Sequence, residues 1–191
     1  MKIEQVHLFG CGSIGTHLIA NLLGTMQVEH LYLYDKDILE PRNVGHRIRL
    51  LQNIKKKKVI ALKEDLILNF NNKIQPHRIY DSVGDILIKN ININKDALVL
   101  DCLDNFAARQ YTTKYHNVLH VGFSPDLTGT VHWNENYRIE DSVHKDDPCD
   151  MEGFYPFLSI LSSVAVFSIM EYLKDNKKNN YVVFGKKVEI F

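Results

Sequence analysis

The feature that most constrains the fold is a glycine motif near the N-terminus. Val6–Phe9 reads as a buried strand, and it runs directly into Gly10-Cys11-Gly12-Ser13-Ile14-Gly15, which has the form G-x-G-x-x-G. The apolar spacing that follows predicts a helix over Thr16–Leu23. Glycines at these positions let a strand turn sharply into a helix and let a phosphate approach the helix N-terminus. The candidate phosphate-binding residues are Gly10, Gly12, Ser13 and Gly15.

A carboxylate follows the glycine motif at the sequence separation that is typical of a nucleotide site. Leu31–Tyr34 predicts a second strand, and it ends in Asp35, 20 residues after Gly15. That spacing suits a carboxylate that accepts hydrogen bonds from the two hydroxyls of a ribose. The two features together indicate a nucleotide without distinguishing NAD, FAD and ATP, and a tight turn with no ligand is the alternative.

Strand and helix patterns alternate along the rest of the chain. Further helices are expected over Lys57–Phe70, Asn105–His116 and from Phe154 to Leu173. Further strands are expected over Lys73–Ile79, Ala97–Leu100, Val118–Gly122, Gly129–Trp133 and, as a hairpin around Gly185, Tyr181–Phe184 and Lys187–Ile190. This order predicts an α/β, Rossmann-like fold with a largely parallel sheet, helices on both faces and a C-terminal antiparallel hairpin. We expect residues 1–191 to form a single domain.

Composition narrows the class of protein. The 23 Lys and Arg residues balance 23 Asp and Glu residues, which argues against binding to nucleic acid or to an anionic membrane. Three cysteines are too few for a disulfide framework, so we expect a cytoplasmic protein. The stretch from Phe154 to Met170 carries no charge but contains four serines, and it falls short of a membrane span. We expect a buried or interface helix there.

Two further motifs distinguish among the nucleotides. Asp35 opens the pattern D-x-D-x-x-E-x-x-N-x-x-x-R, which ends at Arg47, and Lys58 follows 11 residues later. The predicted strand Ala97–Leu100 leads into Asp101-Cys102-Leu103-Asp104-Asn105, with Arg109 one helical turn further on. In this order and spacing the motifs resemble the ThiF/MoeB/HesA family of ubiquitin-activating-enzyme-like adenylyltransferases. The resemblance covers nearly the whole chain, which would be a short member of that family.

The resemblance implies ATP and Mg²⁺ as cofactors. The glycines would cradle the phosphates, and Asp35 would hold the ribose. The triphosphate would be contacted by Asn43, Arg47 and Lys58. Asp104 would bind Mg²⁺ with Asn105 beside it, so the catalytic candidates are Arg47, Lys58 and Asp104.

Each of these residues also has a structural alternative. Arg47 and Lys58 could be solvated surface charges, and Asp104 could cap a helix N-terminus. Asp37 is a further nucleotide-binding candidate, although a local cap or ion pair is the favoured interpretation of it. Arg109 matches a family arginine whose role looks structural.

The chemistry of adenylation agrees with these residue types. A carboxylate is joined to the α-phosphate of ATP, and a chain terminus with a pKa of ~3.5 is already ionised at neutral pH. The reaction therefore needs positioning and positive charge rather than a general base. The resemblance implies that the substrate is the C-terminus of a ubiquitin-like or sulfur-carrier protein, or of a peptide. The apolar helix after Phe154 suggests a homodimer.

The cysteines raise a separate question. Cys149, four residues before Gly153, resembles a cysteine that handles the activated acyl group in sulfur-transferring members. Four acidic neighbours disfavour a reactive thiolate there, so an inert loop cysteine is the alternative. Many relatives bind zinc through two C-x-x-C pairs, but three cysteines cannot supply four thiolates, and no zinc is expected.

Other function classes stay open on the sequence. An NAD-binding Rossmann oxidoreductase shares the glycine motif and Asp35. A family member acting on a small molecule or on tRNA, or a non-catalytic nucleotide-binding module, would share the later motifs as well.

Overall fold

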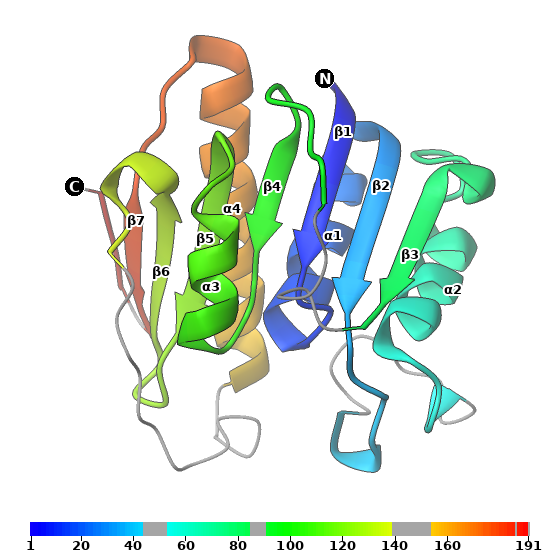
Figure 1. Ribbon diagram of the computed structural model, residues 1–191. Coiled ribbons are helices and arrows are strands. Elements are labelled where there is room, and N and C mark those ends of the chain that lie inside the picture. Colours follow the sequence, from blue (N-terminus) through cyan, green and yellow to red (C-terminus); the bar gives the residue numbers. More distant parts are fainter. Residues whose placement is uncertain (44–52, 85–90, 139–153, 186, 191) are drawn as a thin grey trace.

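The computed structural model describes residues 1–43, 53–84, 91–138, 154–185 and 187–190. Its centre is an eight-stranded sheet with the order β3-β2-β1-β4-β5-β6-β7-β8 (Figure 1). The strands are β1 (Lys2–Phe9), β2 (Gln27–Asp35), β3 (Ile79–Val83), β4 (Leu98–Asp101), β5 (Asn117–Phe123), β6 (Thr128–Trp133), β7 (Tyr181–Phe184) and β8 (Lys187–Ile190). The helices are α1 (Ser13–Thr25), α2 (Lys58–Phe70), α3 (Phe106–Thr112) and α4 (Phe154–Asp175).

The sheet has a parallel half and an antiparallel half. Strands β3, β2, β1, β4 and β5 are paired in parallel, whereas β6, β7 and β8 continue the sheet in antiparallel pairs. The chain passes from β1 outward to β2 and β3, and then returns to place β4 on the other side of β1. The order therefore reverses between β1 and β4, and a crevice for a ligand opens at the carboxyl ends of such strands.

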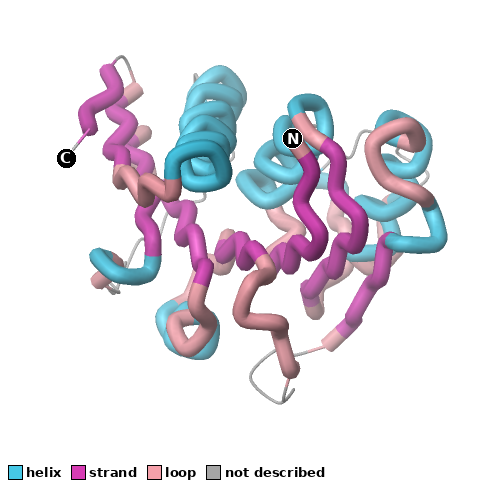
Figure 2. Tube along the Cα trace, turned by 90° about the horizontal axis from the view of Figure 1, so that it is seen from above, coloured by secondary structure: helices cyan, strands magenta, loops and turns pink. Residues whose placement is uncertain are grey.

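Helices cover both faces of the sheet, as the alternating pattern predicts. Helices α1, α2 and α4 lie on one face, and α3 lies on the other (Figure 2). The first face holds the larger core, in which buried leucines of the sheet such as Leu8 and Leu33 share a cluster with Leu18 and Leu158. The second face holds a smaller aromatic cluster that includes Phe9 and residues of β2, β4, β5 and α3. The Rossmann-like prediction is confirmed.

Helix α4 is long and apolar enough to cross a membrane by length and composition alone. In this fold it packs against α1 and β6, and residues such as Phe157, Leu161 and Ala165 are fully buried. Two of its serines have partners inside the protein. The Asn21 side-chain amide donates to Ser162 at 2.7 Å, and the Trp133 indole donates to Ser168 at 2.8 Å. The helix is thus a core element of the described fold.

Two predicted elements were placed wrongly. The strand expected over Lys73–Ile79 starts only at Ile79, because Ile74 is a buried residue just after α2 and Pro76 opens the short 3-10 helix η3 (Pro76–Arg78). The helix expected over Asn105–His116 is shorter, since Asn105 is its N-cap and Thr113 its C-cap. The hairpin around Gly185 occurs as predicted, with Phe184 opposite Lys187.

Candidate functional site

The glycine motif forms the turn between β1 and α1, and its three glycines have different roles. Gly10 has a φ of +90°, and a Cβ atom there would lie 2.6 Å from the Cys102 carbonyl oxygen. A Cβ on Gly15 would lie 2.0 Å from the Gly10 carbonyl oxygen. A Cβ on Gly12 meets no described atom within 4 Å. Gly10 and Gly15 are therefore required by the fold, whereas Gly12 leaves open space above the start of α1.

That open space lies at a helix N-terminus suited to an anion. Gly12 is the N-cap of α1, no side chain among the described residues caps it, and the first turn contains no acidic residue. The first bond of the helix runs from the Thr16 N–H to the Gly12 carbonyl. The N–H groups before Thr16 have no acceptor within the helix. The turn therefore offers backbone donors and a positive dipole end to a phosphate.

Asp35 is the last residue of β2, and its carboxylate is tied to the glycine turn. One oxygen accepts the Cys11 N–H at 2.7 Å, and the other accepts the Asp37 N–H at 2.8 Å. Burial raises the pKa of Asp35, while these two N–H groups and the nearby Lys58 oppose the rise. An ionised carboxylate oxygen can accept more than one hydrogen bond. Asp35 can therefore bind ribose hydroxyls while it holds the turn.

Lys58 is brought to the same place by a backbone contact. The residues after β2 pair with the residues before α2, since the Leu39 N–H donates to the Lys56 carbonyl at 2.7 Å and the Lys58 N–H to the Asp37 carbonyl at 3.0 Å. The Lys58 ammonium lies 3.0 Å from the Asp37 carboxylate, and its side chain is only 16% exposed. This pairing places the first residue of α2 beside the carboxyl end of β2.

The charges around Lys58 come from two strand ends. Burial lowers the pKa of Lys58, but the carboxylates of Asp35, Asp37 and Asp104 outweigh it, and the net shift is upward. Lys58 therefore stays protonated between the carboxyl ends of β2 and β4. Its neighbour Lys56 pairs instead with Glu64 of α2 at 2.7 Å. Of these two lysines, Lys58 is the one directed at the predicted site.

The turn after β4 presents Asp104 and Asn105. The Asn105 side-chain oxygen accepts the Ala108 N–H at 2.9 Å, so Asn105 caps α3. Asp104, which the sequence left as an alternative cap, is exposed, and the Asn105 amide lies 3.4 Å from one of its oxygens. The Asp104 carboxylate is consequently available to a ligand.

Two residues of the motifs, the predicted triphosphate contact Asn43 and the motif arginine Arg109, make structural hydrogen bonds here. The Asn43 side-chain oxygen accepts the Glu40 N–H at 3.0 Å and stabilises the 3-10 turn η1 (Pro41–Asn43). The guanidinium of Arg109 donates to the Tyr137 hydroxyl at 2.9 Å and to the Val121 carbonyl at 3.2 Å. A Cβ on Gly122 would lie 2.9 Å from that guanidinium. Arg109 therefore braces α3 against β5, in agreement with a structural role.

Behind the Asp104 turn lies a buried polar cluster that sequence reasoning missed. Asp101 is fully buried, and one of its oxygens lies 2.7 Å from His120 Nδ1 on β5. The same oxygen accepts the Thr112 hydroxyl at 2.6 Å, and the other accepts the Leu103 N–H at 3.0 Å. The signal available in the sequence was a carboxylate at the end of an apolar strand, which cannot be buried without partners.

Two predicted site residues, Arg47 and Cys149, lie outside the described residues. The other two cysteines are buried packing residues. Burial raises the pKa of the Cys11 thiol, and the nearby Asp35 adds to the rise; burial also raises the pKa of Cys102. Neither is suited to act as a nucleophile.

The residues present fit Mg²⁺ bound together with a nucleotide. Within the described ranges, no three His, Cys, Asp or Glu side chains form a group that could hold a metal ion. Mg²⁺ commonly takes one or two carboxylates together with substrate phosphates, and it needs no cage of protein ligands. An exposed Asp104 facing the same site as Lys58 and the start of α1 meets that requirement.

Comparison with known proteins agrees with this geometry. The sequence matches the ThiF family over residues 2–187. Among solved structures, Escherichia coli MccB with AMPCPP and MccA has a TM-score of 0.74 at 12% identity, and E. coli MccB with ATP has a TM-score of 0.71 at 15% identity. PaaA has a TM-score of 0.69 at 16% identity. No curated protein matches significantly.

These matches show the fold over almost all of this chain. The alignments cover 98% of it, but 62% of each MccB chain and 63% of PaaA. The chain thus spans about three fifths of the length of the structures that it resembles.

Proposed function

The chain belongs to the ThiF family, and from that premise we propose that it is an ATP-dependent adenylyltransferase that activates a carboxylate. The observation that carries the proposal is the convergence of four features at one edge of the sheet. They are the open start of α1 at Gly12, the ribose-type carboxylate Asp35, the protonated Lys58 and the exposed Asp104. An oxidoreductase would have no use for the last two.

In this proposal each group has one role toward ATP. The N–H groups at the start of α1 bind phosphate oxygens, and Asp35 binds the ribose. Lys58 exchanges its bond to Asp37 for one to the triphosphate. Mg²⁺, held by Asp104 together with phosphate oxygens, would supply further positive charge. Arg47 would add another cation.

The reaction needs no proton transfer from the substrate. An ionised carboxylate oxygen forms a bond to the α-phosphorus, and the bond from that phosphorus to the pyrophosphate oxygen breaks. The products are an acyl-adenylate and pyrophosphate. Since both reactants are anions, the protein must lower their repulsion, and loss of one such stabilising group costs about 3 kcal/mol of barrier, or about 100-fold in rate.

We propose that the carboxylate is a chain terminus, of a peptide or of a ubiquitin-like or sulfur-carrier protein. The similar E. coli MccB was solved with the peptide MccA, which favours a peptide. The proposed compartment is the cytoplasm. Cys149 would act only after adenylation, so Cys149→Ser should leave acyl-adenylate formation intact.

The decisive experiment is ATP–pyrophosphate exchange with candidate peptides and carrier proteins, with AMP adducts followed by mass spectrometry. The wild-type chain should exchange label in the presence of Mg²⁺ and one such carboxylate. Asp104→Ala should lower the rate about 100-fold without unfolding the protein. Leu68→Ala is the matched control, because Leu68 is 69% exposed on α2. Saturable binding of NADH with no binding of ATP would overturn the proposal.

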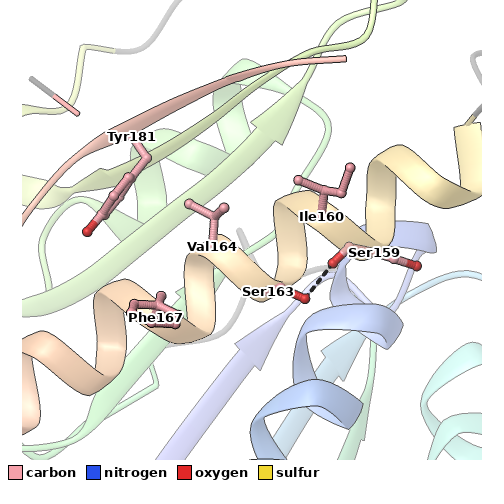
Figure 3. Close-up of a pocket in the computed structure, with 6 residues that line it drawn as sticks. All are labelled: Ser159, Ile160, Ser163, Val164, Phe167 and Tyr181. Carbon is pink, nitrogen blue, oxygen red and sulfur yellow. Dashed lines mark hydrogen bonds between the residues drawn. The ribbon is translucent and has the colours of Figure 1, made fainter. Parts of the chain in front are cut away.

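We also propose a homodimer formed through α4. An open groove of about 500 Å³ lies between α4 and β7, and Figure 3 shows Ile160, Val164 and Phe167 lining it beside Tyr181. Phe167 is 64% exposed and Ile160 is 42% exposed, which is unusual for large apolar side chains on one helix face. Phe167→Glu should convert a dimer to a monomer in light scattering, while Leu68→Glu should not. A wild-type monomer at high concentration would refute the dimer and leave the adenylation proposal intact.

A further inference from the structure

The turn that carries Asp104 has no regular secondary structure of its own, yet Asp104 must be held in place to serve a metal. Asp101 begins the turn at the end of β4, and Asn105 ends it at the cap of α3. Of the two oxygens of Asp101, one binds the turn through the Leu103 N–H, and the other faces His120 and Thr112. The carboxylate therefore connects the turn to β5 and α3 at once.

The partners of His120 define where its protons lie. The Asn134 side-chain amide donates to the carbonyls of Thr113 and Tyr115, at 2.8 and 3.1 Å. Its oxygen therefore faces His120 Nε2, 3.1 Å away, and Nε2 must donate. Because Nε2 carries a proton, the 2.7 Å contact between Nδ1 and the Asp101 oxygen needs a second proton between them.

The buried pair as a whole is therefore neutral, whichever of the two atoms holds the shared proton. Both side chains are 0% exposed. The imidazole is also fixed from the side, since the Tyr137 ring stacks on it at 3.7 Å and the same tyrosine receives a hydrogen bond from Arg109. A neutral, fully bonded and stacked pair defines one geometry for Asp101, and through Leu103 it defines one geometry for the turn.

We infer that His120 is a positioning residue for the metal site: by holding Asp101 it fixes the turn that presents Asp104 to Mg²⁺ at the triphosphate. This rests on the proposed function of Asp104. The His120 side chain is fully buried, and its two ring nitrogens face Asp101 and Asn134. Its effect should therefore appear in the Mg²⁺ dependence of ATP binding. Residues that hold a metal ligand directly commonly change metal affinity by about 10- to 100-fold, and since His120 acts at a further remove, through Asp101 and the Leu103 N–H, we expect an effect at the lower end of that range.

Two amide variants separate the two nitrogens of His120. His120→Asn places an amide nitrogen where Nδ1 lies and keeps the donor to Asp101, whereas His120→Gln places it where Nε2 lies and loses that donor. Titration of ATP binding by calorimetry at several Mg²⁺ concentrations should show about a 10-fold higher half-saturating Mg²⁺ for His120→Gln. His120→Asn should stay within about twofold of wild type. His132→Gln, on the neighbouring strand opposite His120, is the matched control and should also stay within about twofold.

A second comparison tests whether the effect passes through Asp104. In an Asp104→Asn background, His120→Gln should change the Mg²⁺ dependence less than about twofold, because the ligand that it positions is already lost. Equal losses in the two backgrounds, or equal losses in His120→Gln and His120→Asn, would overturn the inference. If His120→Gln does not fold, Thr112→Val, which removes the other donor to the same Asp101 oxygen, gives the same readout. A wild type that binds Mg²⁺ and ATP but exchanges no pyrophosphate would refute the proposed function alone.

Discussion

The two strand ends that form the site are held by different means. At the end of β1 the turn is fixed chiefly by backbone geometry, through a positive φ at Gly10 and a close approach of Gly15 to Gly10, and one side chain, Asp35, binds it through the Cys11 N–H. At the end of β4 the turn is fixed by side chains, through Asp101, His120 and their partners. The turn after β1 depends on the absence of a side chain at Gly10 and Gly15. The turn after β4 depends on several polar side chains being present together.

This difference determines how each half should fail. A turn fixed by backbone geometry has little tolerance for an added atom. A buried polar cluster also tolerates changes of side-chain size poorly. It loses most stability when one partner is removed and another is left buried without a hydrogen bond. Each half of the site therefore serves as a control for the other.

The largest effect is expected from removing the centre of the β4 cluster. Asp101→Ala leaves His120 Nδ1 and the Leu103 N–H without their hydrogen-bond partner, so the free energy of unfolding should fall by about 3–5 kcal/mol. Asp104→Ala, three residues away and exposed, should change it by less than about 0.5 kcal/mol. Urea denaturation of both variants measures the contrast. Equal stability of the two would show that the buried cluster does not hold the turn.

The glycine turn should fail by steric overlap. Gly15→Ala places a methyl group 2.0 Å from the Gly10 carbonyl oxygen, and since that atom belongs to the backbone, α1 must move; we expect a loss of about 3 kcal/mol. Gly12→Ala meets no described atom within 4 Å, and its cost should be smaller, about 0.5–1 kcal/mol, because alanine is a poorer N-cap residue than glycine. Its methyl group should nonetheless weaken ATP binding, because it occupies the space proposed for the phosphates. Thermal melts and ATP titrations of both variants test this, and a stable Gly15→Ala protein would contradict the steric account.

The same difference explains what the sequence could predict. The glycine turn, Asp35 and the open position at Gly12 depend on residues that are close in the chain or at a fixed spacing, so their pattern predicts them. Lys58 was also identified, although its approach depends on the pairing of residues 37–39 with residues 55–58.

The β4 half was predicted only in outline. Whether Asp104 or Asn105 caps α3 depends on a shift of one residue in the helix start, which propensity does not determine. The partnership of Asp101 and His120 spans 19 residues and two strands, and no periodicity indicates which of nine histidines lies opposite a carboxylate. The misplaced β3 has a similar cause, because Ile74 is buried by the end of α2 and not by a strand.

A second buried histidine, on β1, should make the stability of the protein depend on pH. His7 on β1 faces the neutral Tyr34 hydroxyl at 3.0 Å, and burial lowers its pKa from 6.5 to about 4. Below pH 6.5 His7 therefore binds a proton in the unfolded chain but stays neutral in the folded protein, so the stability of the fold decreases as the pH falls toward 4. The loss between pH 7 and pH 5 should be about 2 kcal/mol.

The test is the slope of stability against pH. His7→Phe keeps a ring against Tyr32, which His7 stacks on at 4.4 Å, but removes the titration, so its stability should vary less between pH 7 and pH 5. His116→Gln, which changes an exposed histidine, should keep the wild-type slope. An unchanged slope in His7→Phe would show that His7 is not the group responsible.

The smallest effect concerns the contact that joins the glycine half to α2. Asp37 is 52% exposed, and its ion pair with Lys58 should contribute less than about 1 kcal/mol to stability. In the proposed enzyme the triphosphate must displace Asp37 from Lys58, so Asp37→Asn removes both a competitor and a negative charge. We expect ATP to bind about two- to fivefold more tightly to this variant, with the difference shrinking at high salt. Weaker binding would instead place the Asp37 carboxylate among the groups that contact the nucleotide. Asp81→Asn, which breaks the comparable exposed pair with Lys63 on the same helix, separates a general effect of charge from one at the site.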